Sequence, residues 1–145
     1  MRSLILLVIA RGLLPVTTLF ALYLLWRGHN APGGGFIAGL VTAAALLLQA
    51  LAFGARFTRE RLTPLLRPAM WLGLLVAMAA GLWGVAQGTP FLTHFHAYLP
   101  VPGRAPLYLS TALLFDLGVY LAVVGVTGTL MAVFSEPAPD AEAER

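Results

Sequence analysis

The chain has 145 residues, of which 59% are hydrophobic and 10% are charged, and its formal net charge is +3. Soluble domains carry about 45–50% apolar and about 25% charged residues, so this composition excludes an ordinary soluble domain and predicts a membrane protein. Cysteine is absent, which excludes disulfides and thiolate metal sites, and the small positive charge is too dispersed to predict nucleic-acid binding.

The first predicted membrane helix covers residues 3–26, with Arg11 as its one charged side chain. About 20 apolar residues are enough to cross a bilayer. Pro15 frees one backbone carbonyl, which membrane helices tolerate. Arg11 either extends to the interface near the start of the helix or lies embedded in the span. The apolar run has no small-x-small cleavage pattern, so we expect a retained helix rather than a cleaved signal.

A glycine-rich stretch at residues 28–40, GHNAPGGGFIAGL, connects this helix to a second one predicted at residues 36–54. Glycines that precede a helix can hold an anion at its N-terminus, but the GxxxxGK and GxGxxG motifs are both absent. We therefore favour a structural interpretation. In it, Pro32 and three glycines turn the chain sharply back into the membrane, and Gly35 and Gly39 allow a neighbouring helix to approach closely.

The third predicted helix covers residues 69–86, which carry no charge, and Pro68 would lie in its first turn. Before it, residues 55–67 contain four arginines and one glutamate. This charge density predicts a short cationic loop on the membrane surface.

The fourth predicted helix covers residues 107–134, with Asp116 as its single charge. It follows a polar loop at residues 87–106, in which four prolines exclude one continuous helix. Residues 135–145 form an acidic Pro/Ala tail that we expect to be disordered. The predicted fold class is all-α: a polytopic membrane protein with a four-helix transmembrane domain over residues 1–134 and no soluble domain.

The distribution of arginine predicts the orientation. With four spans, both termini and the central cationic loop share one side of the membrane, and that side carries at least five arginines. The other side carries two, Arg27 and Arg104. Because positive residues are retained in the cytoplasm, we expect both termini there and the glycine-rich and proline-rich loops together outside.

Two helices carry stripes of small residues at steps of three and four, which keep one helical face. In lipid, helices associate through close packing at such residues. The stripes would seal this chain's own bundle or dock another subunit, and the pattern supports both alternatives equally. They consist of Gly73, Ala77, Gly81, Gly84 and Gly88 in the third helix and Gly118, Ala122, Gly125 and Thr129 in the fourth.

Asp116 is the one acidic residue inside a predicted span, and Tyr120 and Thr127 follow on its side of the helix. An ionisable group at the bilayer centre costs roughly 3 kcal/mol on insertion scales. One interpretation is a carboxylate that is accessible to protons or cations at a subunit interface or wet cavity. The other is a carboxylate near the outer interface, paired with Arg104 or capping backbone amides. Depth decides between them: a helix that starts at Leu107 places Asp116 about 14 Å deep, and a start near Ser110 makes it shallower.

Three histidines, His29, His94 and His96, share the predicted outer side. They lack a fixed helical spacing and an accompanying carboxylate, so we expect no metal site and treat them as loop histidines that titrate near neutrality. The sequence has no Ser/His/Asp order, no paired carboxylates and no HExxH motif. We therefore expect no catalytic residues and no enzymatic activity.

Three motifs in this order resemble a known family. GHNAPGGGFIAGL after the first helix, GTPFLTHFH after the third and STALLFDLGVYLAVVG in the fourth are similar to the B subunit of Mrp-type multisubunit sodium/proton antiporters, the MnhB/MrpB family. The resemblance covers essentially residues 11–134. Related stretches occur in the C-terminal part of the large A subunit and in membrane-bound hydrogenase complexes.

The resemblance implies an accessory component of an antiporter complex in a prokaryotic cell membrane. It implies other subunits and membrane lipid as partners, Na+ and H+ as the ions of the complex, and no cofactor. The matching motif residues are Pro32, Gly33, Gly34, Gly35 and Phe36 in the first motif, Pro90, Phe91 and His94 in the second, and Asp116, Gly118 and Tyr120 in the third.

The main functional hypothesis is that the chain shapes or lines a sodium or proton route. Candidates for that route are Asp116, Tyr120, Thr127, His29 and His94. The alternatives are a homologous component of a hydrogenase-type respiratory complex, a purely structural spacer, and a self-sufficient small channel or carrier.

Overall fold

The computed structural model describes residues 4–28, 34–99 and 107–134. Four stretches of helix are long and apolar enough to cross a membrane. This confirms the predicted all-α, multi-pass membrane fold. The elements are α1 (Leu4–Gly28), α2 (Gly35–Phe53), α3 (Ala55–Phe57), the π-helical turn η1 (Thr58–Leu62), α4 (Thr63–Ala86), β1 (His96–Leu99), β2 (Leu107–Ser110) and α5 (Thr111–Phe134).

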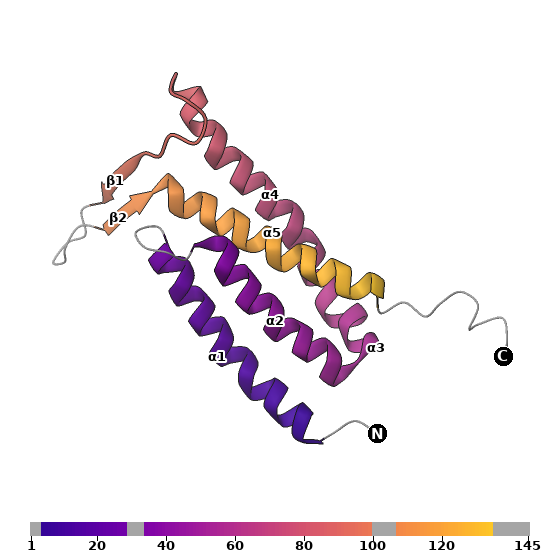
Figure 1. The fold of residues 1–145 in the computed structure, drawn as a ribbon. Coiled ribbons are helices and arrows are strands. Elements are labelled where there is room, and N and C mark those ends of the chain that lie inside the picture. Colours follow the sequence, from indigo (N-terminus) through magenta and orange to yellow (C-terminus); the bar gives the residue numbers. More distant parts are fainter. Residues whose placement is uncertain (1–3, 29–33, 100–106, 135–145) are drawn as a thin grey trace.

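The four long helices form a single row rather than a closed bundle (Figure 1). α1 packs on α2, α2 packs on α5, and α5 packs on α4. The last described helix, α5, is therefore inserted between α2 and α4, and it contacts α1 as well. Because the row is one helix thick, both of its faces are left for lipid or for other proteins.

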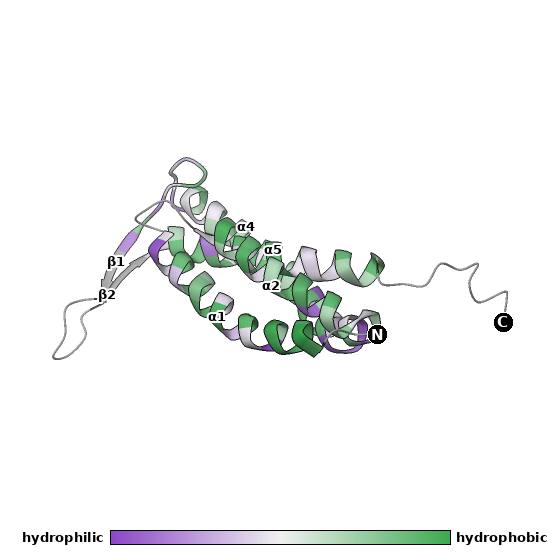
Figure 2. Ribbon diagram, turned by 60° about the horizontal axis from the view of Figure 1, so that its bottom comes forward, coloured by the Kyte–Doolittle hydropathy of each residue, from purple (hydrophilic) through white to green (hydrophobic). Residues whose placement is uncertain are grey.

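Small side chains form most of the buried surface. Ala10, Ala21, Ala38 and Ala52 are at most 1% exposed, whereas Leu4, Leu51 and Phe134 are at least 68% exposed. Figure 2 shows hydrophobic colouring along most of the helix lengths, with hydrophilic residues concentrated towards their ends. This distribution is expected in a bilayer, where close backbone approach drives helix contacts and the large apolar side chains face lipid.

The prediction of a cationic loop at residues 55–67 was wrong, because this segment is helical and continuous with α4. Gly54, at φ +85°, ends α2, and the chain then runs as helix from Ala55 to Ala86. Buried Thr58 donates its hydroxyl to the carbonyl of Gly54, and the hydroxyl of Thr63 donates to the carbonyl of Thr58. The wider η1 turn precedes Pro64, which lacks a backbone donor, so the proline is accommodated without ending the helix.

The fourth long helix starts later than residue 107. Residues 107–110 instead form β2, which pairs antiparallel with β1 in the register His96↔Ser110 to Leu99↔Leu107. The oxygen of the Ser110 side chain accepts the backbone N–H of Ala112 at 3.1 Å, the bond expected of a serine N-cap. Thr111 and Phe95 exchange two further hydrogen bonds at the base of this hairpin, at 3.1 and 3.0 Å.

Candidate functional site

Asp116 lies in the second turn of α5 and packs against the start of α2. A Cβ built on Gly34 would lie 3.3 Å from both carboxylate oxygens of Asp116, and one built on Gly35 would overlap the backbone carbonyl of Asp116. Gly34 also has φ +89°, a conformation that other residues rarely adopt. Two of the clustered glycines are therefore explained by the close passage of α5 at Asp116.

The depth of Asp116 follows from the start of α5. Thr111 is the first residue of this helix, so Asp116 lies about 8 Å along the axis at 1.5 Å per residue. This is the shallower of the two depths that the sequence allowed. The side chain is partly exposed, close to the end of the helix row that carries the β-hairpin.

The start of α2 lies beside Asp116, at Gly34 and Gly35. The first N–H groups of a helix have no acceptor within the helix, and an anion beside them is stabilised by the helix dipole. Within the described part of the chain, the ion pair of Arg56 and Glu60 is the only one, so Asp116 has no cationic partner there. Arg104, the partner considered from the sequence, lies outside the described residues.

Tyr120 lies one helical turn beyond Asp116 on the same side of α5. Its hydroxyl is 3.1 Å from the hydroxyl of Thr42 on α2, in a partly buried hydrogen bond. At the same level, a Cβ on Gly39 would lie 2.8 Å from Cβ of Val123. The α2–α5 contact thus combines close glycine packing with a polar pair. Tyr120 also packs against two groups of buried apolar residues, one containing Leu46 and Val124 and the other containing Ala21 and Ala38.

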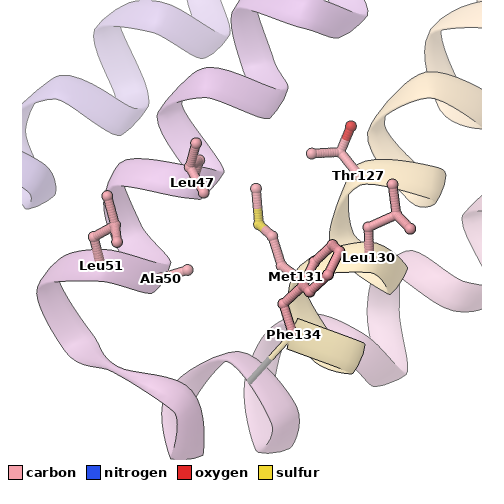
Figure 3. Close-up of a pocket in the computed structure, with 7 residues that line it drawn as sticks. All are labelled: Leu47, Ala50, Leu51, Thr127, Leu130, Met131 and Phe134. Carbon is pink, nitrogen blue, oxygen red and sulfur yellow. The ribbon is translucent and has the colours of Figure 1, made fainter. Parts of the chain in front are cut away.

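Thr127 continues the same side of α5 towards the C-terminal end. Its hydroxyl donates to the carbonyl of Val123 in its own helix at 2.9 Å. It lines an apolar groove of about 380 Å³ between α2 and α5 (Figure 3). Val123 and buried Val124 and Leu46 separate this groove from Tyr120, so the described residues hold no unbroken chain of polar groups from Asp116 to Thr127.

The remaining candidates for an ion route are not brought to this contact. His94 is exposed in the segment between α4 and β1. His29, together with the motif residues Pro32 and Gly33, lies outside the described residues. Phe36, the last residue of the first motif, is 57% exposed on α2 and is available to lipid or a partner. No group of three potential metal-binding side chains occurs among residues 4–28, 34–99 and 107–134.

The small-residue stripes divide into two contacts. The larger part seals α4 against α5: a Cβ on Gly118 would lie 2.5 Å from the backbone N of Ala77 and 2.8 Å from the carbonyl oxygen of Gly73. Ala122 and Gly125 continue this contact, against Gly73 and Met70. This part of the stripes therefore forms a contact within this chain rather than a free docking face, whereas a Cβ on Gly88 would have nothing within 4 Å.

Gly81 and Gly84 were expected in the same stripe but pack against the loop that follows α4. A Cβ on Gly81 would lie 2.9 Å from the ring of Phe91, and one on Gly84 would lie 2.8 Å from the carbonyl oxygen of Pro90. The motif residues Pro90 and Phe91 thus fold back over the end of α4. In this position Phe91 covers Gly81 and Pro90 covers Gly84.

Three residues of this region were not identified as site residues from the sequence: Thr42, Gln49 and Gly128. Thr42 forms a hydrogen bond with Tyr120, and the amide of buried Gln49 donates a hydrogen bond to the carbonyl of Ala10 on α1. Gly128 packs against the side chain of Leu66 on α4. Thr42 and Gln49 are the only polar side chains of α2. They lie seven residues apart, so they are on the same face of the helix. That spacing is the signal that identifies the face of α2 turned towards its neighbours.

Comparisons with known proteins agree with this architecture. The profile of the family described as "Domain related to MnhB subunit of Na+/H+ antiporter" matches residues 5–129. The chain is 41% identical over 121 residues to the B subunit of a Na(+)/H(+) antiporter of Bacillus subtilis, covering 83% of this chain and 85% of that protein. It is 45% identical over 124 residues to a probable K(+)/H(+) antiporter A/B subunit of Rhizobium meliloti, covering 83% of this chain and 12% of that protein.

A solved structure has the same arrangement of helices. A chain of the Mrp complex from Dietzia sp. DQ12-45-1b matches with a TM-score of 0.76 and 36% sequence identity. The match covers 93% of this chain and 14% of that chain, so the fold described above also occurs as a small part of a much longer polypeptide. The chain belongs to the family of domains related to the MnhB subunit of Na+/H+ antiporters.

Proposed function

We propose that this protein is an accessory membrane component of a multisubunit antiporter that exchanges a monovalent cation for protons. The observation that carries the proposal is the open row of helices, in which no described helix closes either face. Residues 4–28, 34–99 and 107–134 form a row one helix thick, which encloses no route across the membrane by itself. It therefore works as part of a larger assembly, and this argues against a self-sufficient channel. The relatives named as antiporter subunits supply the kind of assembly.

The proposed partners are the other subunits of the antiporter complex. The Rhizobium meliloti relative, whose name combines the A and B subunits, is about eight times longer than the matched region, which supports placing this chain beside a large A-type subunit. The transported cation is Na+ in the name of the Bacillus relative and K+ in the name of the Rhizobium relative. We assign this chain to a complex for monovalent cations of this class, without an enzymatic reaction of its own.

We place the chain in the cell membrane of a prokaryote with both termini in the cytoplasm. Arg56, Arg59 and Arg61 on α3 and η1 lie at the end of the row where α1 begins and α5 ends. Arg11 of α1 lies at the same end, 5.2 Å from the ring of Phe53 in the last turn of α2. Arg27 is in the last turn of α1, at the opposite end. This asymmetry supports a cytoplasmic location for the arginine-rich end.

Within the complex, we assign the α2–α5 contact around Asp116 to the ion or proton route. The carboxylate is partly exposed, lacks a cationic partner among the described residues and lies beside the start of α2. A carboxylate in this position can hold a proton or a monovalent cation that reaches it from a neighbouring subunit. Tyr120 and Thr42 extend the polar surface by one turn.

The test is Asp116→Asn in the complete complex, with cation-dependent proton movement measured in inverted membrane vesicles. We expect at least a tenfold loss of this activity while all subunits still copurify, because the amide keeps the shape but loses the titratable charge. Glu60→Gln is the matched control, since Glu60 is an exposed carboxylate outside the α2–α5 contact. Full activity in Asp116→Asn with normal assembly would remove Asp116 from the route and favour the spacer interpretation.

The kind of complex is tested by purifying the tagged chain from its own membranes in a mild detergent and identifying its companions by mass. Several large polytopic subunits without a redox protein are the expected result. Companions with iron–sulfur or nickel centres would instead assign the chain to a hydrogenase-type complex.

A further inference from the structure

The side chain of Gln49 is a polar group buried in a membrane-spanning helix, α2, where it is 4% exposed. Its amide nitrogen donates a hydrogen bond to the carbonyl oxygen of Ala10 on α1. A glutamine amide can donate two hydrogen bonds, and its oxygen can accept two more. Among the described residues, the bond to Ala10 is the only one that this side chain makes. The amide oxygen and one N–H group are therefore buried without a partner in the described part of the chain, although buried polar groups are generally hydrogen-bonded.

A second acceptor lies on the same turn of α1. In an α-helix the carbonyl oxygen of Arg11 would accept the backbone N–H of the fourth residue after it, but that residue is Pro15, which has no N–H. The side chain of Arg11 faces α2, because its guanidinium lies 5.2 Å from the centre of the Phe53 ring. Phe53 follows Gln49 by four residues and so lies on the same side of α2. The carbonyl of Arg11 and the amide oxygen of Gln49 thus belong to one contact between α1 and α2.

The peptide group that carries the Arg11 carbonyl also has space beside it. The next residue is Gly12, which has no side chain, and nothing lies within 4 Å of the position that a Cβ on it would take. A buried water needs room for about one water molecule and two to four polar partners. The two acceptors match the two O–H groups of one water, and the second N–H of Gln49 matches the water oxygen.

We propose that one buried water molecule binds between α1 and α2 and donates hydrogen bonds to the carbonyl of Arg11 and to the amide oxygen of Gln49. A lipid or a side chain of another subunit does not reach Gln49, because the chain itself covers this residue. A sodium ion is disfavoured, because the guanidinium of Arg11 lies in the same contact and repels a cation. The water joins α1 to α2 at the arginine-rich end, and this inference does not rest on the proposed function.

The direct test is a density map of the detergent-purified complex at a resolution that shows ordered waters elsewhere in it. We expect a water within about 3 Å of both the amide oxygen of Gln49 and the carbonyl oxygen of Arg11. A map that shows other buried waters but none at this position would overturn the proposal. Density for an ion, a lipid or a side chain of another subunit at this position would overturn it as well.

A double-mutant cycle tests the water without a map. Gln49→Met removes the amide but keeps a side chain of similar length, and Pro15→Ala gives the Arg11 carbonyl a donor within α1. We expect Gln49→Met to lower the Tm of the complex, and to lower it less when Pro15→Ala is also present, because the water has then already lost a partner.

The matched control for this cycle is Pro68→Ala, since Pro68 also lies inside a long helix, α4, outside the α1–α2 contact. The fall in Tm that Gln49→Met causes should be the same with and without Pro68→Ala. An equal fall with and without Pro15→Ala would overturn the proposal, because no water would then link the two groups. A rise in Tm for Gln49→Met alone would also overturn it, since the amide would then be buried without a partner.

Discussion

The two sides of α5 differ in how they hold their neighbours. On the α4 side, Gly73 and Gly118 bring backbone against backbone, and the contact contains no hydrogen bond between side chains among the described residues. On the α2 side, Asp116 and Tyr120 face glycines and a threonine, and the contact opens into a groove further along.

We propose that this difference reflects a division of tasks within one helix. Small residues at regular spacing make a dry contact whose geometry has little freedom, because any added atom meets backbone. A contact that contains a partly exposed carboxylate, a tyrosine and a groove can exchange protons, ions or lipid with its surroundings. We therefore regard the α4–α5 pair as the scaffold and the α2–α5 contact as the region that functions.

Gly73→Leu should have the largest effect. The new side chain would meet the carbonyl oxygen of Gly118, 2.6 Å from the Cβ position, and backbone atoms of Leu121, which do not move easily. Overpacking of this kind typically costs about 1–3 kcal/mol and sometimes more. We expect loss of folded protein, measured as the yield of monodisperse complex and its Tm.

The matched control for this change is Gly12→Leu, because nothing lies within 4 Å of a Cβ at Gly12 on α1. Equal yields of the two variants would show that the α4–α5 contact is not the scaffold.

Gly35→Ala should rank second. A single methyl group there overlaps the carbonyl of Asp116 and lies 3.0 Å from its Cα, so α2 and α5 must separate slightly. We expect a fall in stability of about 1–2 kcal/mol, within the usual cost of overpacking, and a larger relative loss of cation-dependent proton movement. Gly12→Ala is the control. Full transport activity in Gly35→Ala would mean that the spacing between α2 and Asp116 does not matter.

The hydrogen bond between Tyr120 and Thr42 should have a smaller effect. A double-mutant cycle of Tyr120→Phe and Thr42→Val, followed by unfolding in detergent, should give a coupling energy of about 0.6 kcal/mol, the average for side-chain bonds between membrane helices. A coupling energy of zero would show that the two hydroxyls do not interact in the membrane.

Thr127→Val should have the smallest effect. Among the described residues, the hydroxyl of Thr127 donates a hydrogen bond only to the carbonyl of Val123 in its own helix, so its removal should change stability by less than about 0.5 kcal/mol and leave transport unchanged. Thr129→Val is the matched control, because its hydroxyl makes an equivalent bond of 2.9 Å to Gly125. A large loss of transport in Thr127→Val alone would extend the route along the whole α2 side of α5.

Two helix boundaries were not predicted correctly from the sequence: the start of the helical segment before α4 and the start of α5. The charge density of residues 55–67 predicted a loop, but the buried Thr58 and the η1 turn keep the segment helical. The start of α5 was placed too early because residues 107–109 are apolar, and apolar residues fit a strand as well as a helix. Ser110 was the local signal for the true start, since its side chain caps the helix.

The candidate site was predictable in part. Asp116 was identified because a carboxylate in an apolar span is costly, and Tyr120 because it follows at helical spacing. Thr42 was not identified as its partner, since 78 residues separate the two and no periodicity links one helix to another. For the same reason the sequence left open whether the glycine stripes face this chain or another protein.

The sequence by itself determined that the chain lies in a membrane, how many times it crosses, and which helix faces carry small or polar residues. These properties are local, because a span needs about 20 apolar residues and a helix satisfies its own backbone hydrogen bonds in lipid. Only the tertiary structure decided the order of the helices, α1–α2–α5–α4, and therefore which faces meet. That order depends on how closely particular backbones can approach: α5 inserts beside α2 and α4 because glycine faces it on both sides, and Asp116 thereby comes to lie against Gly34 and Gly35.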